Sequence, residues 1–275
     1  MKITKASGEQ ETYSRQKLCN SLKAAGAPKD LVEQVCRMVE KEIVPGMTTQ
    51  EISERTRAYL TKESTVHAAR YSLKRGIMEL GPAGFLFEQY AAALLKEYGY
   101  ATRTNQILKG ECVSHEIDIL ALSKDTHFIV ETKYHNSRGI KSDVTVVMYL
   151  YARLLDIAGY QRKRERKPAK HVSWLFTNTK FTTSARRYAA CKGIRLTGWK
   201  HPKRESLEKL IEGKALYPVT VLPSVNRYAK ERFAERKLYF AKDLVHFTPR
   251  QFQELFGIQQ TIAQNIQKEA AALCA

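Results

Sequence analysis

Two carboxylates and a lysine stand in the middle of the sequence at spacings that could bring them to one place in the fold. Asp118 lies in the run EIDIL, and Glu131 and Lys133 lie in the run VETKYH. Carboxylate oxygens are ligands that Mg²⁺ prefers, and a bound metal lowers the pKa of a water ligand. A neighbouring lysine can orient or deprotonate that water. These side chains are therefore candidates for a site that hydrolyses phosphodiester bonds.

A β-hairpin is expected to bring these side chains together. Two strand-like runs, 117–122 and 127–133, flank the turn-forming sequence Ser-Lys-Asp-Thr. If the hairpin closes symmetrically, Asp118 faces Glu131 directly, with Cβ atoms roughly 5 Å apart. Lys133 lies two residues beyond Glu131 and shares its face of the strand. A surface hairpin with a Glu–Lys ion pair is the alternative interpretation.

Further elements must surround the hairpin. The run AGFLFEQYAAALLKEYG has apolar residues at helical spacing and carries Glu88 near its buried side, where a carboxylate needs a partner. After the hairpin we expect a helix near 142–158, a strand at 172–177, a helix near 182–191 and a strand at 193–199. The predicted core is thus α/β, in the order αβββαβ.

Four runs of this region, FEQYAAALLKEYGY, EIDIL, VETKYHN and LFTNTKFTTSARRYA, resemble the Mrr-like branch of the PD-(D/E)xK restriction-endonuclease-like nucleases over about residues 82–200. The resemblance implies a metal-dependent deoxyribonuclease of type II or IV. Asp118 and Glu131 would be metal ligands, Lys133 the catalytic lysine and Glu88 an auxiliary carboxylate. It also implies Mg²⁺ as cofactor, Mn²⁺ as its substitute, and a role against foreign DNA.

The distribution of charge favours nucleic acid as the partner. The 275 residues include 46 Lys and Arg against 28 Asp and Glu, a net charge of +18. Residues 162–214 hold 16 basic and 4 acidic residues, whereas residues 85–161 are close to neutral. We expect the basic segment 162–214 to bind the DNA backbone. A solvated basic face is the alternative, also for the charged run 162–170.

The first 80 residues read as two short strands followed by helices. Ser14 is a predicted N-cap, and two pairs have the spacing of a capping box: Asp30 with Glu33, and Thr48 with Glu51. The alternative to a binding function here is a small helical domain around a Leu, Val and Ile core.

The order Lys5-x-x-Gly8, Glu11, Tyr13-Ser14, Lys17-Leu18, Thr48-Thr49-x-Glu51-Ile52 and Ala68-Ala69-Arg70-Tyr71 resembles the ATP-cone, a regulatory nucleotide-binding domain, over about residues 1–85. The resemblance implies that ATP or dATP binds at Lys5, Glu11, Ser14, Lys17 and Thr49. It also implies a homo-oligomer whose assembly depends on the bound nucleotide.

The C-terminal segment is expected to be helical. Residues 255–266, LFGIQQTIAQNI, resemble a helix-hairpin-helix, which implies contact with DNA phosphates without base reading. A helical mini-domain that packs on another part of the protein is the alternative. The predicted fold class is multidomain α+β: a mostly helical ATP-cone at 1–81, a restriction-endonuclease-like α/β core at 82–214 and a helical tail at 215–275.

The remaining expectations concern the compartment. Five cysteines without CxxC spacing predict neither a disulfide framework nor a cysteine zinc site, and favour a reducing cytoplasm. We expect no signal peptide and no membrane span. The primary hypothesis is an Mg²⁺-dependent DNA endonuclease regulated by ATP or dATP. A nucleotide-responsive DNA-binding regulator that does not cleave, and an RNA nuclease, are the alternatives.

Overall fold

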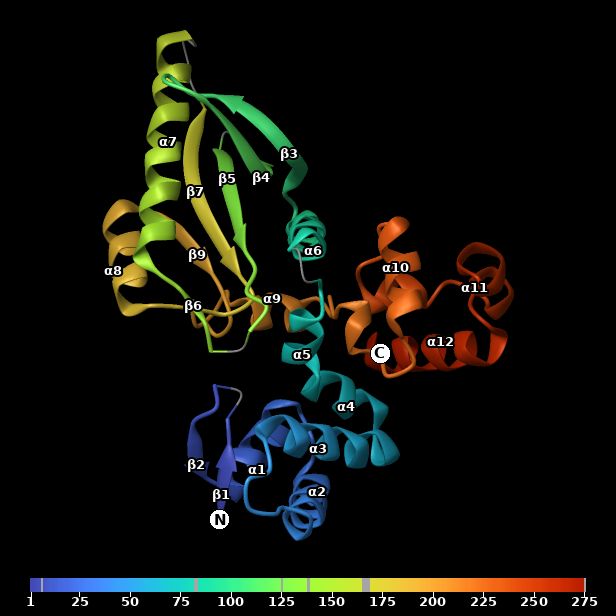
Figure 1. Ribbon diagram of the computed structural model, residues 1–275. Coiled ribbons are helices and arrows are strands. Elements are labelled where there is room, and N and C mark those ends of the chain that lie inside the picture. The colour runs from blue at the N-terminus through green and yellow to red at the C-terminus, as the bar shows by residue number, and fades with distance from the viewer. Residues whose placement is uncertain (6, 82–83, 125, 138, 165–168, 275) are drawn as a thin grey trace. The chain divides into compact units, whose positions relative to one another are not determined.

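The computed structural model describes all residues except 6, 82–83, 125, 138, 165–168 and 275 (Figure 1). The chain divides into two compact units. One combines Met1–Ile77 with Tyr217–Ala275, and the other is Met78–Leu216. Parts of the predicted turn, of the predicted basic segment and of the predicted boundary at Pro82 lie outside the described residues.

The unit formed by Met78–Leu216 is built on a five-stranded mixed sheet. Its elements are α6 (Phe85–Glu97), β3 (Ala101–Lys109), β4 (Ser114–Ser123), β5 (Thr126–Lys133), β6 (Lys141–Ser142), α7 (Val144–Arg164), β7 (Lys170–Thr177), β8 (Lys180–Phe181), α8 (Thr183–Lys192), β9 (Arg195–Thr197) and α9 (Leu207–Gly213). The strand order is β3-β4-β5-β7-β9. β3, β4 and β5 are antiparallel neighbours, whereas β5, β7 and β9 run parallel. β6 and β8 form a separate parallel pair.

Helices cover both faces of this sheet (Figure 1). On one face, Ile129 and Leu175 pack with Leu150 of α7 and with α8. On the other face, Val130 and Trp174 pack with α6. Alternate residues of β5 and β7 therefore enter two different apolar cores, and this double burial explains the continuous apolar runs in their sequences.

The predicted hairpin register is confirmed, but the ladder is shorter than expected. Leu122 pairs with His127, and the last pair is Ile119–Val130. Asp118 is therefore not a ladder partner of Glu131, because β4 leaves β5 one residue earlier. The predicted strand at 193–199 is also shorter, since Gly193 adopts a left-handed conformation with a φ of 68° and ends α8.

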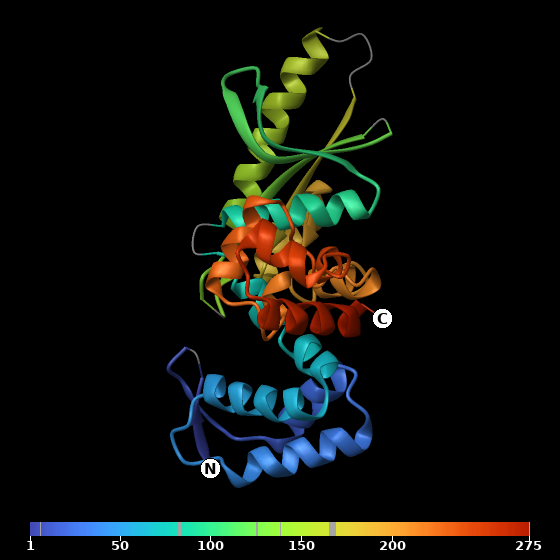
Figure 2. The same cartoon turned by 90° about the vertical axis from the view of Figure 1, so that its right-hand side faces the viewer.

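The other unit contains β1 (Lys2–Thr4), β2 (Gln10–Thr12), α1 (Arg15–Ala24), α2 (Lys29–Lys41), α3 (Thr49–Glu63), α4 (Thr65–Tyr71), α5 (Leu73–Met78), the 3₁₀ turns η1 (Val219–Val221) and η2 (Ala241–Leu244), α10 (Arg227–Glu235), α11 (Pro249–Phe256) and α12 (Gln260–Cys274). β1 and β2 form a hairpin. The turned view in Figure 2 shows α2 and α3 side by side. Leu22, Val35 and Leu60 lie fully buried in the core beneath the hairpin and helices.

Two of the three predicted helix starts are confirmed. The Ser14 hydroxyl accepts from the backbone of Lys17, and Thr48 forms a reciprocal capping box with Glu51. The predicted box of Asp30 and Glu33 is wrong. α2 begins earlier, after Pro28, whose ring fixes the φ angle and which forms no side-chain cap.

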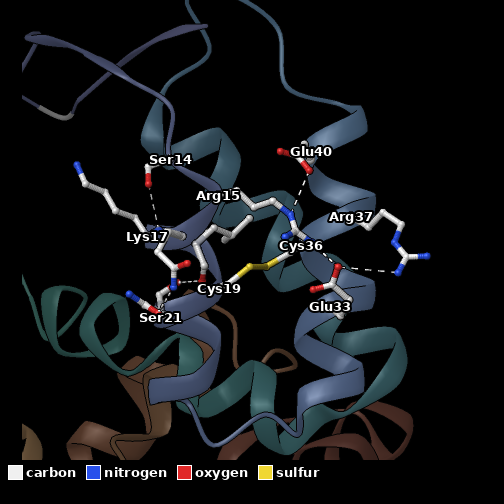
Figure 3. Close-up of a disulfide and its surroundings, with 12 residues drawn as sticks. Ser14, Arg15, Lys17, Cys19, Ser21, Glu33, Cys36, Arg37 and Glu40 are labelled. Carbon is white, nitrogen blue, oxygen red and sulfur yellow. Dashed lines mark hydrogen bonds and ion pairs between the residues drawn. A yellow bond between two sulfur atoms is a disulfide. The ribbon is translucent and has the colours of Figure 1, made fainter.

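A single disulfide joins α1 to α2, a bond that the cysteine count and spacing do not predict. Cys19 and Cys36 are bonded, with Cα atoms 6.1 Å apart (Figure 3). Beside them, the Arg15 guanidinium reaches Glu33 at 2.5 Å and Glu40 at 3.2 Å. Cys112, Cys191 and Cys274 are free thiols. The fold thus has one covalent link between neighbouring helices rather than a framework.

The C-terminal elements form a helical pair with an aromatic core. α11 ends at Gly257, which adopts a φ of 66°, and α12 follows after a short turn. The rings of Phe233, Phe252 and Phe256 lie 5.1–6.1 Å from one another. Among the described residues, none of the helices combines the length and the apolar character needed to cross a membrane.

Candidate functional site

The Asp118 carboxylate lies at the point where β4 separates from β5, and a residue of β5 holds it. The backbone N–H and the hydroxyl of Thr132 both donate to Oδ2 of Asp118, at 2.7 and 2.9 Å. The side chain of Asp118 thus replaces a strand partner for Thr132. Its other oxygen, Oδ1, accepts no hydrogen bond from the residues that the structure describes.

Glu131 forms a buried ion pair with α7. Nη1 of Arg153 lies 2.5 Å from Oε2 of Glu131, and the side chains are 7% and 20% exposed. Burial raises the pKa of the Glu131 carboxyl, and the charge of Asp118 raises it further, whereas Arg153 and Lys133 oppose this shift. Oε1 of Glu131 makes no hydrogen bond within the described part of the chain.

Arg153 is a site residue that the sequence analysis missed. It occupies a buried position of α7 between Leu150 and Ile157, on the apolar stripe of the helix. A cation on such a stripe needs a carboxylate partner in the interior. The sequence therefore carried a signal that Arg153 needs an acidic partner, but not which residue that partner is.

Glu88, in the first turn of α6, lies within electrostatic reach of both carboxylates. Its pKa is raised to about 7, first by burial and then by the charges of Asp118, Glu116 and Glu131. Carboxylates that share a site raise one another's pKa in this way. Glu88, Asp118 and Glu131 therefore lie within electrostatic reach of one another, and their roles in a site stay predictions.

Lys133 ends β5 beside a small polar network. Its side chain is exposed, and its carbonyl accepts from the hydroxyl of Thr177 at 2.7 Å. The same hydroxyl lies 3.4 Å from that of Ser142, which lies 2.9 Å from Nε2 of His135. Burial lowers the pKa of the His135 imidazole, and the charge of Lys133 adds to this. The network ties the end of β5 to β6 and β7.

These donors suit a hydrated hard cation. No group of three or more His, Cys, Asp or Glu side chains among the described residues has the arrangement of a metal centre. Mg²⁺ is commonly bound by only one or two carboxylates and otherwise by water and substrate phosphates. Asp118 and Glu131 each offer one carboxylate oxygen that no described residue occupies, so this pair fits such an ion.

A basic edge, defined by Lys141 and Lys180, continues from this network. The two lysines are register partners in the β6–β8 pair, and both side chains are exposed. Like charges at such positions repel, and no ion pair with a described acidic residue offsets the repulsion of Lys141 and Lys180. The backbone of Thr182 donates to the carbonyl of Ser142, which links β8 to the polar network.

Most of the residues predicted to bind nucleotide line a pocket of about 160 Å³, open to solvent, in the N-terminal part of the chain. Its lining residues are Ile3, Glu11, Tyr13, Ser14, Lys17, Leu18, Ser21, Thr49, Ile52, Ser53 and Tyr71. Four of the five predicted residues are among them, and Lys5 is not. The hydroxyl of Tyr13 is buried with no hydrogen-bond partner among the described residues, which suits a polar ligand. Tyr13 belongs to the ATP-cone-like motif but is not among the five residues predicted to bind nucleotide.

Glu11 is the anionic partner of both predicted lysines. Its Oε2 lies 2.8 Å from Nζ of Lys17 and 3.6 Å from Nζ of Lys5. The hydrogen bond from Lys17 lowers the pKa of Glu11, and Glu9 raises that of Lys5. The two ammonium groups are thus gathered on one carboxylate at the hairpin and the start of α1.

Family models match three consecutive parts of the chain. An ATP cone domain matches residues 1–77, a nuclease-related domain matches residues 83–175, and an AF1548-like C-terminal domain matches residues 217–274.

Two similar proteins match longer stretches of the chain than any one family model does. An uncharacterized protein of Archaeoglobus fulgidus is 36% identical over 179 residues, which are 65% of this chain and 97% of that protein. The crystal structure of AF1548, a protein of unknown function, is similar with a TM-score of 0.57 and 34% identity. That match covers 69% of this chain and 97% of AF1548. The chain therefore belongs to the AF1548-like family and contains an ATP cone domain and a nuclease-related domain.

Proposed function

We propose that this protein is an Mg²⁺-dependent DNA endonuclease whose activity or assembly is controlled by ATP or dATP. The observation that carries the proposal is the clustering of Glu88, Asp118 and Glu131 at the β4–β5 fork, where burial first, and then the neighbouring carboxylates, raise the pKa of Glu88 to about 7. A bound cation would offset the repulsion between these carboxylates. The matched nuclease-related domain covers all three residues.

Asp118 and Glu131 would hold the metal through Oδ1 and Oε1, with Mn²⁺ as a substitute for Mg²⁺. When bound, the ion would supply an activated water and neutralise charge on the scissile phosphate. Thr132 fixes Asp118, and Arg153 fixes Glu131, so that each carboxylate presents its second oxygen. In this proposal the fold contributes by binding one oxygen of each carboxylate and leaving the other oxygen of Asp118 and of Glu131 for the metal.

Lys133 and Glu88 would act on the water and the phosphate. In our proposal the Lys133 ammonium orients the attacking water and stabilises the negative charge that develops on the phosphate oxygens. Glu88, with a pKa near neutrality, can take up a proton from the water. Both assignments agree with the resemblance to Mrr-like nucleases of the PD-(D/E)xK type.

The basic edge supports nucleic acid as the substrate. Lys141 and Lys180 lie in the β6–β8 pair, which the polar network joins to the end of β5 that carries Lys133, and a phosphate backbone would relieve their mutual repulsion. We propose that the basic segment 162–214 and the C-terminal helices α11 and α12, which resemble a helix-hairpin-helix, add further backbone contacts. DNA rather than RNA follows from the Mrr-like resemblance, as does a role against foreign DNA.

The cavity beside α1 supports the regulatory half of the proposal. Ser14 caps α1 and Thr49 begins α3, so two helix N-termini, which favour phosphate groups, border the cavity. The ammonium groups of Lys17 and of the nearby Lys5 would exchange their ion pairs with Glu11 for ion pairs with the phosphates of ATP or dATP. Tyr13 offers a buried hydroxyl to the same ligand.

A plasmid assay tests the activity. Supercoiled DNA is incubated with the full-length protein in Mg²⁺ or EDTA, with and without ATP and dATP. We expect Mg²⁺-dependent cleavage that falls about 100-fold or more in Lys133→Ala. Lys109→Ala, which removes an exposed lysine at the end of β3 and outside the proposed DNA-binding segment 162–214, is the matched control. Equal cleavage by both variants would overturn the proposal.

The same assay separates the alternatives. Faster hydrolysis of a matched RNA would identify an RNA nuclease. Retention of one DNA fragment without metal-dependent hydrolysis would identify a regulator that does not cleave.

A further inference from the structure

The ladder between β3 and β4 is interrupted at the register position of Asp118. Thr104 pairs with Ile119, and Gln106 pairs with Ile117, but the residues between them do not pair. Asn105, the residue opposite Asp118, has a φ of 52°, which lies in the left-handed region and departs from strand geometry. The interruption therefore coincides with one left-handed backbone angle.

Asp118 loses its strand partner on the other side as well. The β4–β5 ladder ends at Ile119–Val130, and the backbone N–H of Thr132 bonds to the Asp118 carboxylate instead of to a β4 carbonyl. β4 is thus released from both neighbouring strands at the residue that carries the proposed metal ligand.

The distortion at Asn105 is supported by a neighbouring side chain. The amide of Gln106 donates to the carbonyl of Thr104 at 2.8 Å and spans the irregular residue. Asparagine tolerates the left-handed region better than other residues with a side chain, whereas a β-branched residue there is strongly disfavoured. The residue types at 105 and 106 therefore both stabilise the interruption.

We propose that Asn105 is a positioning residue for Asp118. Its left-handed backbone keeps β4 unpaired at this point, so that the Asp118 side chain can turn to Thr132 with one oxygen and leave the other for a cation. The proposal rests on the function proposed above, in which Asp118 is a metal ligand. Irregularities of this kind re-aim side chains next to active sites.

The irregularity at Asn105 has an alternative explanation, which is protection of the edge strand against aggregation. β3 is an outer strand of the sheet, and a kink in an outer strand prevents pairing with a second molecule. In that case the kink would keep the protein monodisperse and would not affect the metal. The two explanations predict different results for the same substitution.

The experiment compares Asn105→Val with Asn105→Gly in the full-length protein. Valine favours a regular strand, whereas glycine keeps the left-handed conformation. Titration calorimetry with Mn²⁺ is expected to show roughly 10- to 100-fold weaker binding for Asn105→Val and near wild-type binding for Asn105→Gly. Ala101→Val, at an exposed position of β3 that pairs regularly with Leu122, is the matched control.

Hydrogen exchange at the backbone of Asp118 gives a readout that does not depend on metal. We expect slower exchange in Asn105→Val, because the ladder closes. If Asn105→Val exchanges more slowly at Asp118 but binds Mn²⁺ as tightly as the wild type, the inference is overturned and the proposed function is unaffected. The same conclusion follows if the variant self-associates in light scattering while its Mn²⁺ affinity is unchanged. A wild-type protein that neither binds Mn²⁺ nor cleaves DNA would overturn the proposed function, and the inference with it.

Discussion

In the Glu131–Arg153 pair, a single guanidinium opposes the rise in pKa that burial imposes on an interior carboxylate. Burial and the neighbouring Asp118 both raise the pKa of Glu131, and the guanidinium opposes them. Because Arg153 is 7% exposed, little solvent can replace it. The pair therefore matters both for folding and for the charge that a metal would meet.

Removal of the guanidinium should leave the Glu131 carboxyl without its partner. We expect Arg153→Met to lower the free energy of unfolding by about 3 kcal/mol, because a buried charge loses its counter-ion. The double variant Arg153→Met/Glu131→Gln should recover about 1–2 kcal/mol of this loss. Urea denaturation of wild type, both single variants and the double variant measures the coupling. Strictly additive losses would contradict the prediction.

Asp156 has a different role, as an anchor for the turn between β3 and β4. Its carboxylate accepts from the backbone of Cys112 at 2.8 Å and lies 2.7 Å from Nε2 of His115. These contacts, the one with His115 first, lower the pKa of Asp156 to about 2. The turn is thereby fastened to the middle of α7.

The low pKa of Asp156 makes part of the stability dependent on pH. A carboxyl whose pKa falls on folding stabilises the native state above its unfolded pKa, and this contribution disappears as the pH falls through about 2. Asp156→Asn should therefore lower the melting temperature at pH 5–7 and approach wild type near pH 2. Circular dichroism melts across this range provide the measurement. A constant difference at every pH would speak against the assignment.

At the scale of elements, the two helices α1 and α2 are joined covalently. The disulfide closes a loop between residues separated by 17 positions, and chain entropy alone then favours the folded state by about 3 kcal/mol. The linked helix α1 also carries Ser14 and Lys17 of the cavity. The bond therefore holds one wall of the cavity against the core.

The disulfide predicts a thiol count and a stability change. In denaturant without reductant, a maleimide should label three of the five cysteines, those at 112, 191 and 274, and all five after reduction. Cys36→Ala should lower the stability of the N-terminal helices by about 3 kcal/mol, whereas Cys191→Ala, at an exposed position, should leave it unchanged. Mass spectrometry and denaturation measure the two effects, and five labelled cysteines before reduction would contradict the bond.

The basic edge predicts a change in salt dependence. Each phosphate contact contributes about 0.9 to the slope of log affinity against log salt. Lys141→Gln/Lys180→Gln should reduce this slope by about 2. Lys109→Gln/Lys124→Gln, which removes equal charge outside the segment 162–214, should leave it unchanged. Fluorescence anisotropy with a DNA duplex from low to physiological salt measures both. Equal effects of the two double variants would mean that only net charge matters.

Sequence patterns within a few residues predicted most of the helices and strands. They did not predict the contacts between segments that are distant in the sequence. The cap at Ser14, the box of Thr48 with Glu51 and the hairpin register follow from spacings of a few residues. The pairings Cys19–Cys36 and Glu131–Arg153 depend on how helices pack, and no local spacing encodes them. The left-handed angle at Asn105 escaped for a similar reason, because it is defined only by the strand beside it.

At the scale of the whole molecule, the chain joins a nucleotide-binding module to a nuclease-related one. Residues 217–275 return to the unit that contains residues 1–77. The hydroxyl of Thr220 donates to the carbonyl of Gly76 at 2.7 Å, and a Cβ at Gly76 would collide with Val221. The sheet unit is therefore inserted into a unit built from both ends of the chain.

The resemblance to other ATP-cones predicts assembly that depends on nucleotide. Sedimentation velocity of the wild type should give different profiles with ATP, with dATP and without nucleotide. Lys17→Ala should remove the response, because it deletes an ammonium group at the cavity. Lys23→Ala, an exposed lysine on the same helix outside the cavity, should retain it. Identical wild-type profiles under the three conditions would contradict the prediction.

The inserted arrangement also orders events during synthesis. Residues 78–216 form a complete unit once residue 216 has left the ribosome. At that point η1 and α12, which pack against Gly76 and α4 in the other unit, have not yet been synthesised. The sheet unit can therefore fold first although it is not first in the sequence. A nascent chain stopped at residue 216 would contain the complete nuclease-related core. Its nucleotide-binding module would lack the contacts with η1 and α12 and would expose the surface that they cover, to which chaperones could bind.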